Sequence, residues 1–77
     1  MNINIQAFLK QFNKEYDFLY ENDNVAGYEE AVNAFDEFIK TKTNGNFVGE
    51  FAKYRCDFIS SDREAAAFMF ALETFNK

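Results

Sequence analysis

The side chains of this chain that are able to do chemistry are mostly carboxylates, and they are concentrated in one stretch. No Lys or Arg interrupts that stretch, which contains Glu15, Asp17, Glu21, Asp23, Glu29, Glu30, Asp36 and Glu37. The rest of the chain holds the other five of the thirteen acidic residues and all eight basic ones. Such a concentrated negative field repels nucleic acid and membranes and attracts positively charged surfaces.

Adjacent carboxylates such as Glu29–Glu30 and Asp36–Glu37 are of the type that serves general acid–base catalysis. Catalytic carboxylates need a cleft that shifts their pKa, and a domain of 77 residues rarely encloses a substrate pocket. The chain also has no His, the usual proton shuttle near neutral pH and the commonest metal ligand. We therefore expect no enzyme activity, no metal and no cofactor.

Two weaker sequence signals, a partial calcium-loop spacing and a lone cysteine, do not change this expectation. Residues 22–24 and Gly27 have the spacing of the start of a calcium loop, but Asn33 stands where that loop needs a bidentate Glu. Cys56 is the single cysteine, with no His or second thiol beside it, so we expect a buried structural residue.

The size of the chain predicts a single domain, residues 1–77, with a dense aromatic core. A domain this small buries only about 60% of the surface that its unfolded chain exposes, and eleven Phe and four Tyr supply the apolar bulk. One Cys forms no internal disulfide, and no apolar run reaches the roughly 18 residues of a membrane span. Residues 1–5 are interrupted by polar side chains, so we expect no signal peptide and a cytoplasmic protein without membrane contact.

Helical periodicity dominates the first half of the chain. An N-cap at Asn4 and an end near residues 21–24 frame an apolar stripe of Ile5, Phe8, Leu9, Phe12, Tyr16 and Leu19. A second helix is predicted to begin at Asp23 or Asn24 and to stop at Asn44-Gly45. Its stripe contains Tyr28, Ala31, Val32, Phe35, Phe38 and Ile39.

The second half contains one ambiguous segment and one clear helix. Residues 46–59 fit a helix through Phe47, Phe51, Tyr54 and Phe58, although residues 53–58 also alternate as a strand would. Ser61 and Glu64 predict a capping box, followed by a stripe of Ala65, Phe68, Met69, Leu72 and Phe75. The expected fold is all-α, a compact bundle of about four short amphipathic helices. The alternative is an α+β fold with a strand pair from residues 1–5 and 52–59.

Part of the acidic tract gains nothing for local helix stability. Asp17 and Glu21 are a like-charge pair four residues apart, which costs a few tenths of a kcal/mol in an isolated helix. Eight charges over 23 residues give roughly one per 4 Å of helix, close to the roughly 3.4 Å spacing of phosphates along one DNA strand. The tract is therefore interpreted as a partner-binding surface that mimics a phosphate row, with simple solubility as the alternative.

Phe18 and Phe70 fall outside the apolar stripes of their helices. They are interpreted as aromatic anchors for a partner. The alternatives are that a small bundle buries them or that they form a homodimer contact. The predicted partner-binding residues are Asp17, Glu21, Glu29, Glu30, Asp36, Glu37, Phe18 and Phe70.

The hypothesis from sequence is a small acidic intracellular inhibitor that occupies a basic, nucleic-acid-binding surface of a larger protein. Its composition, though no motif, is similar to that of compact acidic inhibitors that phages and mobile elements encode against host nucleases and CRISPR complexes. We expect no direct contact with nucleic acid. The alternatives are a homo-oligomeric helical module with a structural or regulatory role, and an antitoxin-like protein that neutralises a basic RNase.

Overall fold

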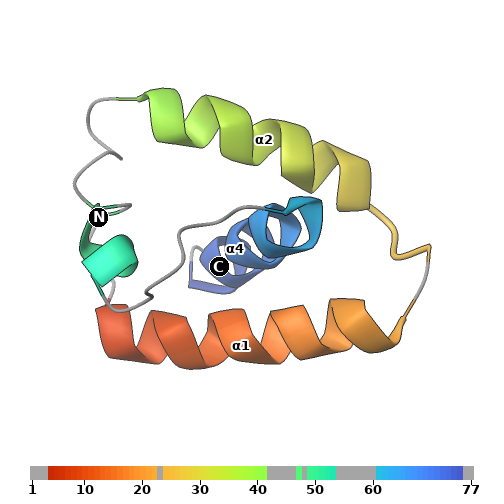
Figure 1. The fold of residues 1–77 in the computed structure, drawn as a ribbon, viewed down its shortest axis with the longest axis horizontal. Helices are drawn as coiled ribbons and strands as arrows, with labels where there is room; N and C mark the ends of the chain where they lie inside the picture. Colours follow the sequence, from red (N-terminus) through yellow and green to blue (C-terminus); the bar gives the residue numbers. More distant parts are fainter. Residues whose placement is uncertain (1–3, 23, 42–46, 48, 54–60, 76–77) are drawn as a thin grey trace.

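Three long helices make up most of the structure, a computed structural model that describes residues 4–22, 24–41, 47, 49–53 and 61–75. The helices are α1 (Ile5–Glu21), α2 (Tyr28–Lys40) and α4 (Asp62–Phe75), and residues 49–53 are helical as well. Helix α4 crosses between α1 and α2 and packs against both (Figure 1). The predicted all-α bundle of about four short helices is confirmed.

The described parts of the proposed strand pair are not strands. Ile5 begins α1, and residues 52 and 53 are helical, as predicted for the ambiguous segment. Residues 1–3 and 54–60, and with them Cys56, lie outside the described residues. Within the described ranges the chain is helix and connecting turns only.

Helix α1 follows its predicted cap and stripe. The Asn4 side chain accepts hydrogen bonds from the backbone N–H groups of Gln6 and Ala7, at 2.9 and 3.2 Å, which satisfies two otherwise unpaired donors. Phe8, Phe12 and Leu19 are buried. The helix ends at Glu21, inside the predicted range.

Helix α2 begins later and ends earlier than predicted. Asn24 and Gly27 both have positive φ angles, of 58° and 82°, so the chain turns twice before the helix begins at Tyr28. The predicted cap at Asp23 or Asn24 is wrong, because the chain still turns after Asn24 and the residue that caps the helix is Gly27. The helix ends at Lys40, and Asn44-Gly45 lies outside the described residues. The predicted stripe is correct, with Ala31 and Phe35 buried and the others half-buried.

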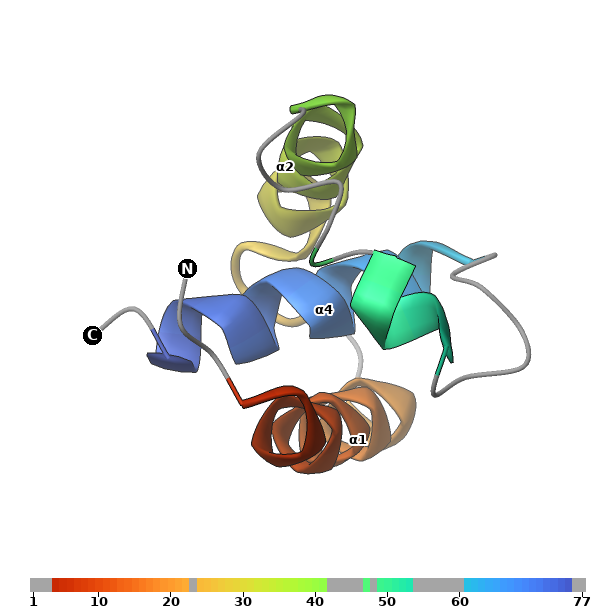
Figure 2. The same ribbon diagram turned by 90° about the vertical axis from the view of Figure 1, so that its left-hand side faces the viewer.

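Helix α4 begins with the predicted capping box. The backbone N–H of Glu64 donates to Ser61 Oγ at 3.3 Å, and that hydroxyl donates to Glu64 Oε1 at 3.0 Å. Its buried face is wider than the predicted stripe, because α1 and α2 cover it from two sides (Figure 2). Three alanines outside the predicted stripe, Ala66, Ala67 and Ala71, are fully buried.

The centre of the core is the aromatic ring of Phe68. It contacts rings from α1, from α2 and from the short helical segment, with centroid distances of 4.9–5.9 Å to Phe8, Phe35, Phe38, Phe47 and Phe51. Most of these pairs meet edge to face, the arrangement that aromatic quadrupoles favour. One α4 side chain thus ties the other elements together.

Candidate protein-binding surface

The six carboxylates predicted to bind a partner are all exposed to solvent. Asp17 and Glu21 lie on α1, and Glu29, Glu30, Asp36 and Glu37 lie on α2. The one ion pair that joins two described residues is elsewhere, between Lys53 and Glu50 at 3.6 Å. None of the six therefore forms an ion pair with a described base.

The structure divides the acidic tract into two surfaces. Helices α1 and α2 lie on opposite sides of α4, and among the described residues they do not pack against each other (Figures 1 and 2). The row of charges is also broken by the turns at Asn24 and Gly27. The acidic tract is therefore not one continuous row of charges.

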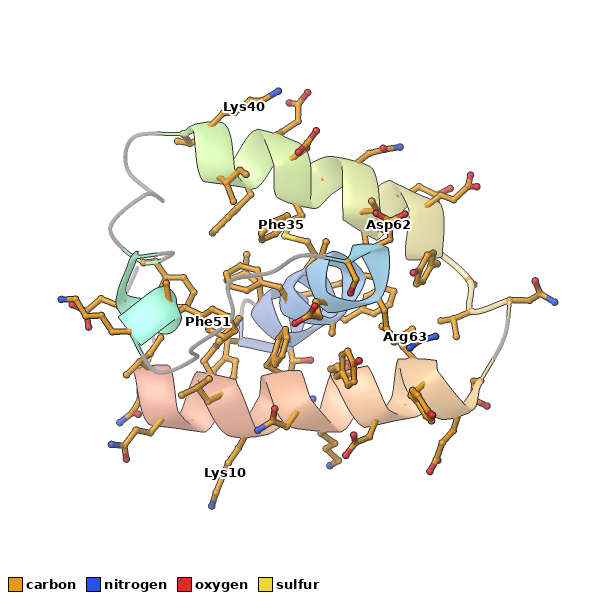
Figure 3. The ribbon with its side chains drawn as sticks, viewed as in Figure 1. Lys10, Phe35, Lys40, Phe51, Asp62 and Arg63 are labelled. Atoms are coloured by element: carbon orange, nitrogen blue, oxygen red, sulfur yellow. The ribbon has the colours of Figure 1, made fainter. Side chains whose placement is uncertain are left out.

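The outer face of α2 keeps the highest density of negative charge. Four carboxylates fall between Glu29 and Glu37, which spans about 12 Å along a helix axis. Phe35 points from α2 toward α4, and oxygen-tipped side chains project from the opposite side of the helix (Figure 3). Lys40 stands at the far end of this face. The anionic face of α2 is thus broad, since Glu30 also lines a groove on one side of the helix and Asp36 a hollow on the other.

Two carboxylates occupy helix ends where they are electrostatically unfavourable. Glu21 is the last residue of α1, and Glu73 lies near the end of α4; neither helix has a basic residue in its last turn. The helix dipole disfavours negative charge there. Glu29 and Glu30, by contrast, lie in the first turn of α2, where the dipole favours them.

The structure brings the two predicted aromatic anchors to one place. Phe18 is 49% exposed and Phe70 is half-buried. Both line a shallow hollow of about 240 Å³, the Phe18 hollow, together with Glu15, Val25, Ala26, Glu73 and Thr74. Phe70 lies outside the predicted apolar stripe of its helix, and it is partly buried against the core.

A larger groove lies between α2 and α4 and shares Ala26, Phe70 and Glu73 with the Phe18 hollow. The turn before α2 and α2 itself contribute Ala26, Gly27, Glu30, Ala31 and Ala34. Helix α4 contributes Met69, Phe70, Leu72 and Glu73. This Phe70 groove has a volume of about 640 Å³ and is open to solvent.

Sequence reasoning did not single out the small residues of α2 as part of a surface. Gly27, Ala31 and Ala34 recur at spacings of four and three, which places them on one narrow face of a helix. A face of small side chains leaves space beside a neighbouring helix, so the signal was present. The pairing of that face with the second half of α4 was not visible without the fold.

Arg63 is a second residue that sequence reasoning missed. Its guanidinium carbon lies 5.0 Å from the ring centroid of Tyr20 and 5.9 Å from that of Tyr16, which links the start of α4 to α1 through cation–π contacts. Arg63 also lines a hollow of about 720 Å³ with Glu29 and Glu30. It supplies a positive charge near the beginning of α2.

The described part of the chain offers little for a metal site or a membrane span. There, no three Asp, Glu, Cys or His residues gather as metal ligands would. Nor does any described helix combine the length and apolar character needed to cross a bilayer. The fold and surface define a small all-α bundle with an exposed anionic helix and an apolar groove beside it. Comparison with protein-family models, curated proteins and solved structures finds no match.

Proposed function

We propose that this protein binds a larger protein by setting the anionic face of α2 against a positively charged surface. The observation that carries the proposal is the set of four exposed carboxylates between Glu29 and Glu37, none paired with a described base. Asp36 and Glu37 lie beyond the first turn of α2, where the helix dipole no longer stabilises a negative charge. Their presence is explained more readily by a partner than by helix stability.

The physics of such a complex divides into two parts. The charges steer the encounter and select the partner, while desolvated apolar contacts hold the complex together. The exposed Phe18 and the half-buried Phe70 are aromatic side chains available for these apolar contacts. Binding is then expected to weaken as salt is added, chiefly through a slower association rate.

The partner surface is proposed to be one that normally binds nucleic acid. Four carboxylates over about 12 Å have roughly the charge spacing of phosphates along one strand. The protein would then act as a cytoplasmic inhibitor, of the kind that phages or mobile elements direct against nucleases or CRISPR complexes. Neutralisation of a basic RNase by an antitoxin-like protein rests on the same physics.

The test begins with affinity capture of the partner from cell extract, followed by mass spectrometry and a binding measurement on the purified pair. The double variant Glu30→Lys and Glu37→Lys is expected to weaken binding by more than about ten-fold while its unfolding midpoint changes little. Nucleic acid and this protein are expected to compete for the partner. Unchanged affinity of the double variant would remove the α2 face from the mechanism.

A matched pair of single variants separates a local effect from the change in net charge. Glu37→Lys and Glu50→Lys alter the net charge equally, and both residues are exposed. Only Glu37 lies on the anionic face of α2, because Glu50 is on the short helical segment beside Lys53. Equal weakening by both variants would indicate a nonspecific charge effect and contradict the proposal.

The second candidate is a homo-oligomeric helical module, favoured by the exposure of two aromatic side chains on α1. Phe18 is 49% exposed and Tyr20 68% exposed, so both aromatic side chains are available for contact with a second copy. Sedimentation at micromolar concentration separates the candidates. A dimer that persists in high salt supports this second candidate, and a monomer supports the first.

A further inference from the structure

The Phe70 groove and the Phe18 hollow adjoin each other and together form a two-part depression. Ala26, Phe70 and Glu73 line both parts and so stand at their common border. The floor of the groove contains the buried side chains of Ala31 and Leu72. The groove part therefore reaches core residues, and its volume of about 640 Å³ is large enough to accept several side chains.

The charged side chains that the structure describes around this depression are all negative. Glu30 and Glu73 line the groove and Glu15 lines the hollow, with no Lys or Arg among the described residues that form either one. Glu73 is also the carboxylate that the dipole of α4 disfavours. A second copy of the chain carries a net charge of −5 and the same acidic rim, so it would place like charges against each other.

We propose that the depression binds a basic amphipathic helix of a partner protein, in a role that rests on the proposed function. The apolar side of that helix lies between α2 and α4 against Ala34 and Phe70. Its Lys or Arg side chains lie against Glu15, Glu30 and Glu73. Helix-in-groove recognition of this kind uses apolar anchors that recur every three or four residues.

The probe is a synthetic helical peptide of about 14 residues with Leu at helical spacing and Lys elsewhere. Two controls accompany it: a scrambled peptide of equal charge without an apolar face, and a peptide in which Glu replaces every Lys. Binding to the full chain is followed by backbone amide shifts in nuclear magnetic resonance spectra. We expect the largest shifts in residues 26–34 and 69–74, and at least about ten-fold weaker binding of each control peptide.

A pair of alanine variants tests the groove itself. Ala34 and Ala7 are both exposed helical residues, but only Ala34 lines the groove. Ala34→Trp fills the space and is expected to weaken peptide binding by at least about ten-fold, since an apolar anchor loses its pocket. Ala7→Trp carries the same side chain outside the groove and is expected to bind as the unaltered protein does.

Three results would overturn the proposal. One is equal binding of the scrambled peptide, because charge alone then explains the affinity. Another is shifts confined to the outer face of α2 and unaffected by Ala34→Trp, which would leave the proposed function standing while excluding the groove. The third is a change in the chemical shifts of the groove residues as the concentration of the protein itself is raised without peptide. That result would make a second copy of the chain the occupant.

Discussion

Phe68 is the residue on which the largest part of the core depends, because its ring meets five others from three parts of the fold. Phe68→Ala removes those contacts and leaves a cavity, so we expect a loss of about 3–5 kcal/mol in the free energy of unfolding. A domain of 77 residues has a total of roughly 4–12 kcal/mol. Urea denaturation followed by circular dichroism measures the loss.

The matched control is Phe18→Ala, since Phe18 is the same residue type with about half of its surface exposed. Its loss should stay below roughly 1 kcal/mol. Equal losses at the two positions would contradict the central role of Phe68.

Ser61 is the second residue whose role is local and measurable. Its hydroxyl accepts from the Glu64 N–H and donates to the Glu64 carboxylate, so Ser61→Ala is expected to cost about 1 kcal/mol of stability. Ser61→Thr keeps the hydroxyl and should recover most of that loss. Thermal unfolding of the three proteins measures both effects, and a Thr variant no better than Ala would show that the hydroxyl is not the cause.

At the scale of the elements, α1 carries a charge arrangement that opposes its own stability. Glu21 lies at the negative end of the helix dipole and four residues after Asp17. Glu21→Lys turns both interactions favourable, so we expect the free energy of unfolding to rise by about 0.5–1 kcal/mol. Denaturation in low salt measures the gain, and Glu21→Gln should give roughly half of it.

A stabilising Glu21→Lys variant also bears on function. If it binds the captured partner as well as the unaltered protein does, the Glu21 carboxylate takes no part in the contact. An unchanged or lowered stability would instead show that Glu21 has a favourable contact at the end of α1 that outweighs the dipole.

At the scale of the whole molecule, the dominant feature is a negative charge that is only partly compensated. The net charge is −5, and the carboxylates of α2 have no described ion-pair partner. Added salt screens their mutual repulsion over about 10 Å at 0.1 M. We therefore expect the Tm to rise as sodium chloride increases from low to moderate concentration, while the partner complex weakens.

The double variant Glu30→Lys and Glu37→Lys provides the comparison, because it removes much of the repulsion on α2. Its Tm should depend less on salt than that of the unaltered protein. A Tm that falls with salt in the unaltered protein would mean that attractive charge pairs outweigh repulsion.

The opposite effects of salt on folding and on binding follow from one cause. Carboxylates gathered on α2 repel one another in the free protein and attract a cationic surface in the complex. Splitting the tract across the two sides of α4 reduces that repulsion, because α1 and α2 are kept apart by a whole helix. The arrangement thus retains a strong field on α2 at a lower cost to the fold.

The sequence by itself determined the helices, their apolar stripes and two of their caps. Asn4, Ser61 and the recurrence of Phe at three and four residues act within one or two helical turns, so their effect does not depend on the rest of the fold. The first residue of α2 could not be predicted from the local sequence in the same way. Asn24 and Gly27 turn the chain through positive φ angles, while an Asp or Asn in sequence favours a turn and a helix cap equally.

Only the tertiary structure decided what the helices enclose and what they expose. Helix α4 lies between α1 and α2, and its alanines are buried because their short side chains let both neighbours approach closely. The same placement separates the acidic helices and brings Phe18 and Phe70 to one depression. Side chains distant in sequence meet through packing on a shared third element, and no local pattern encodes that meeting.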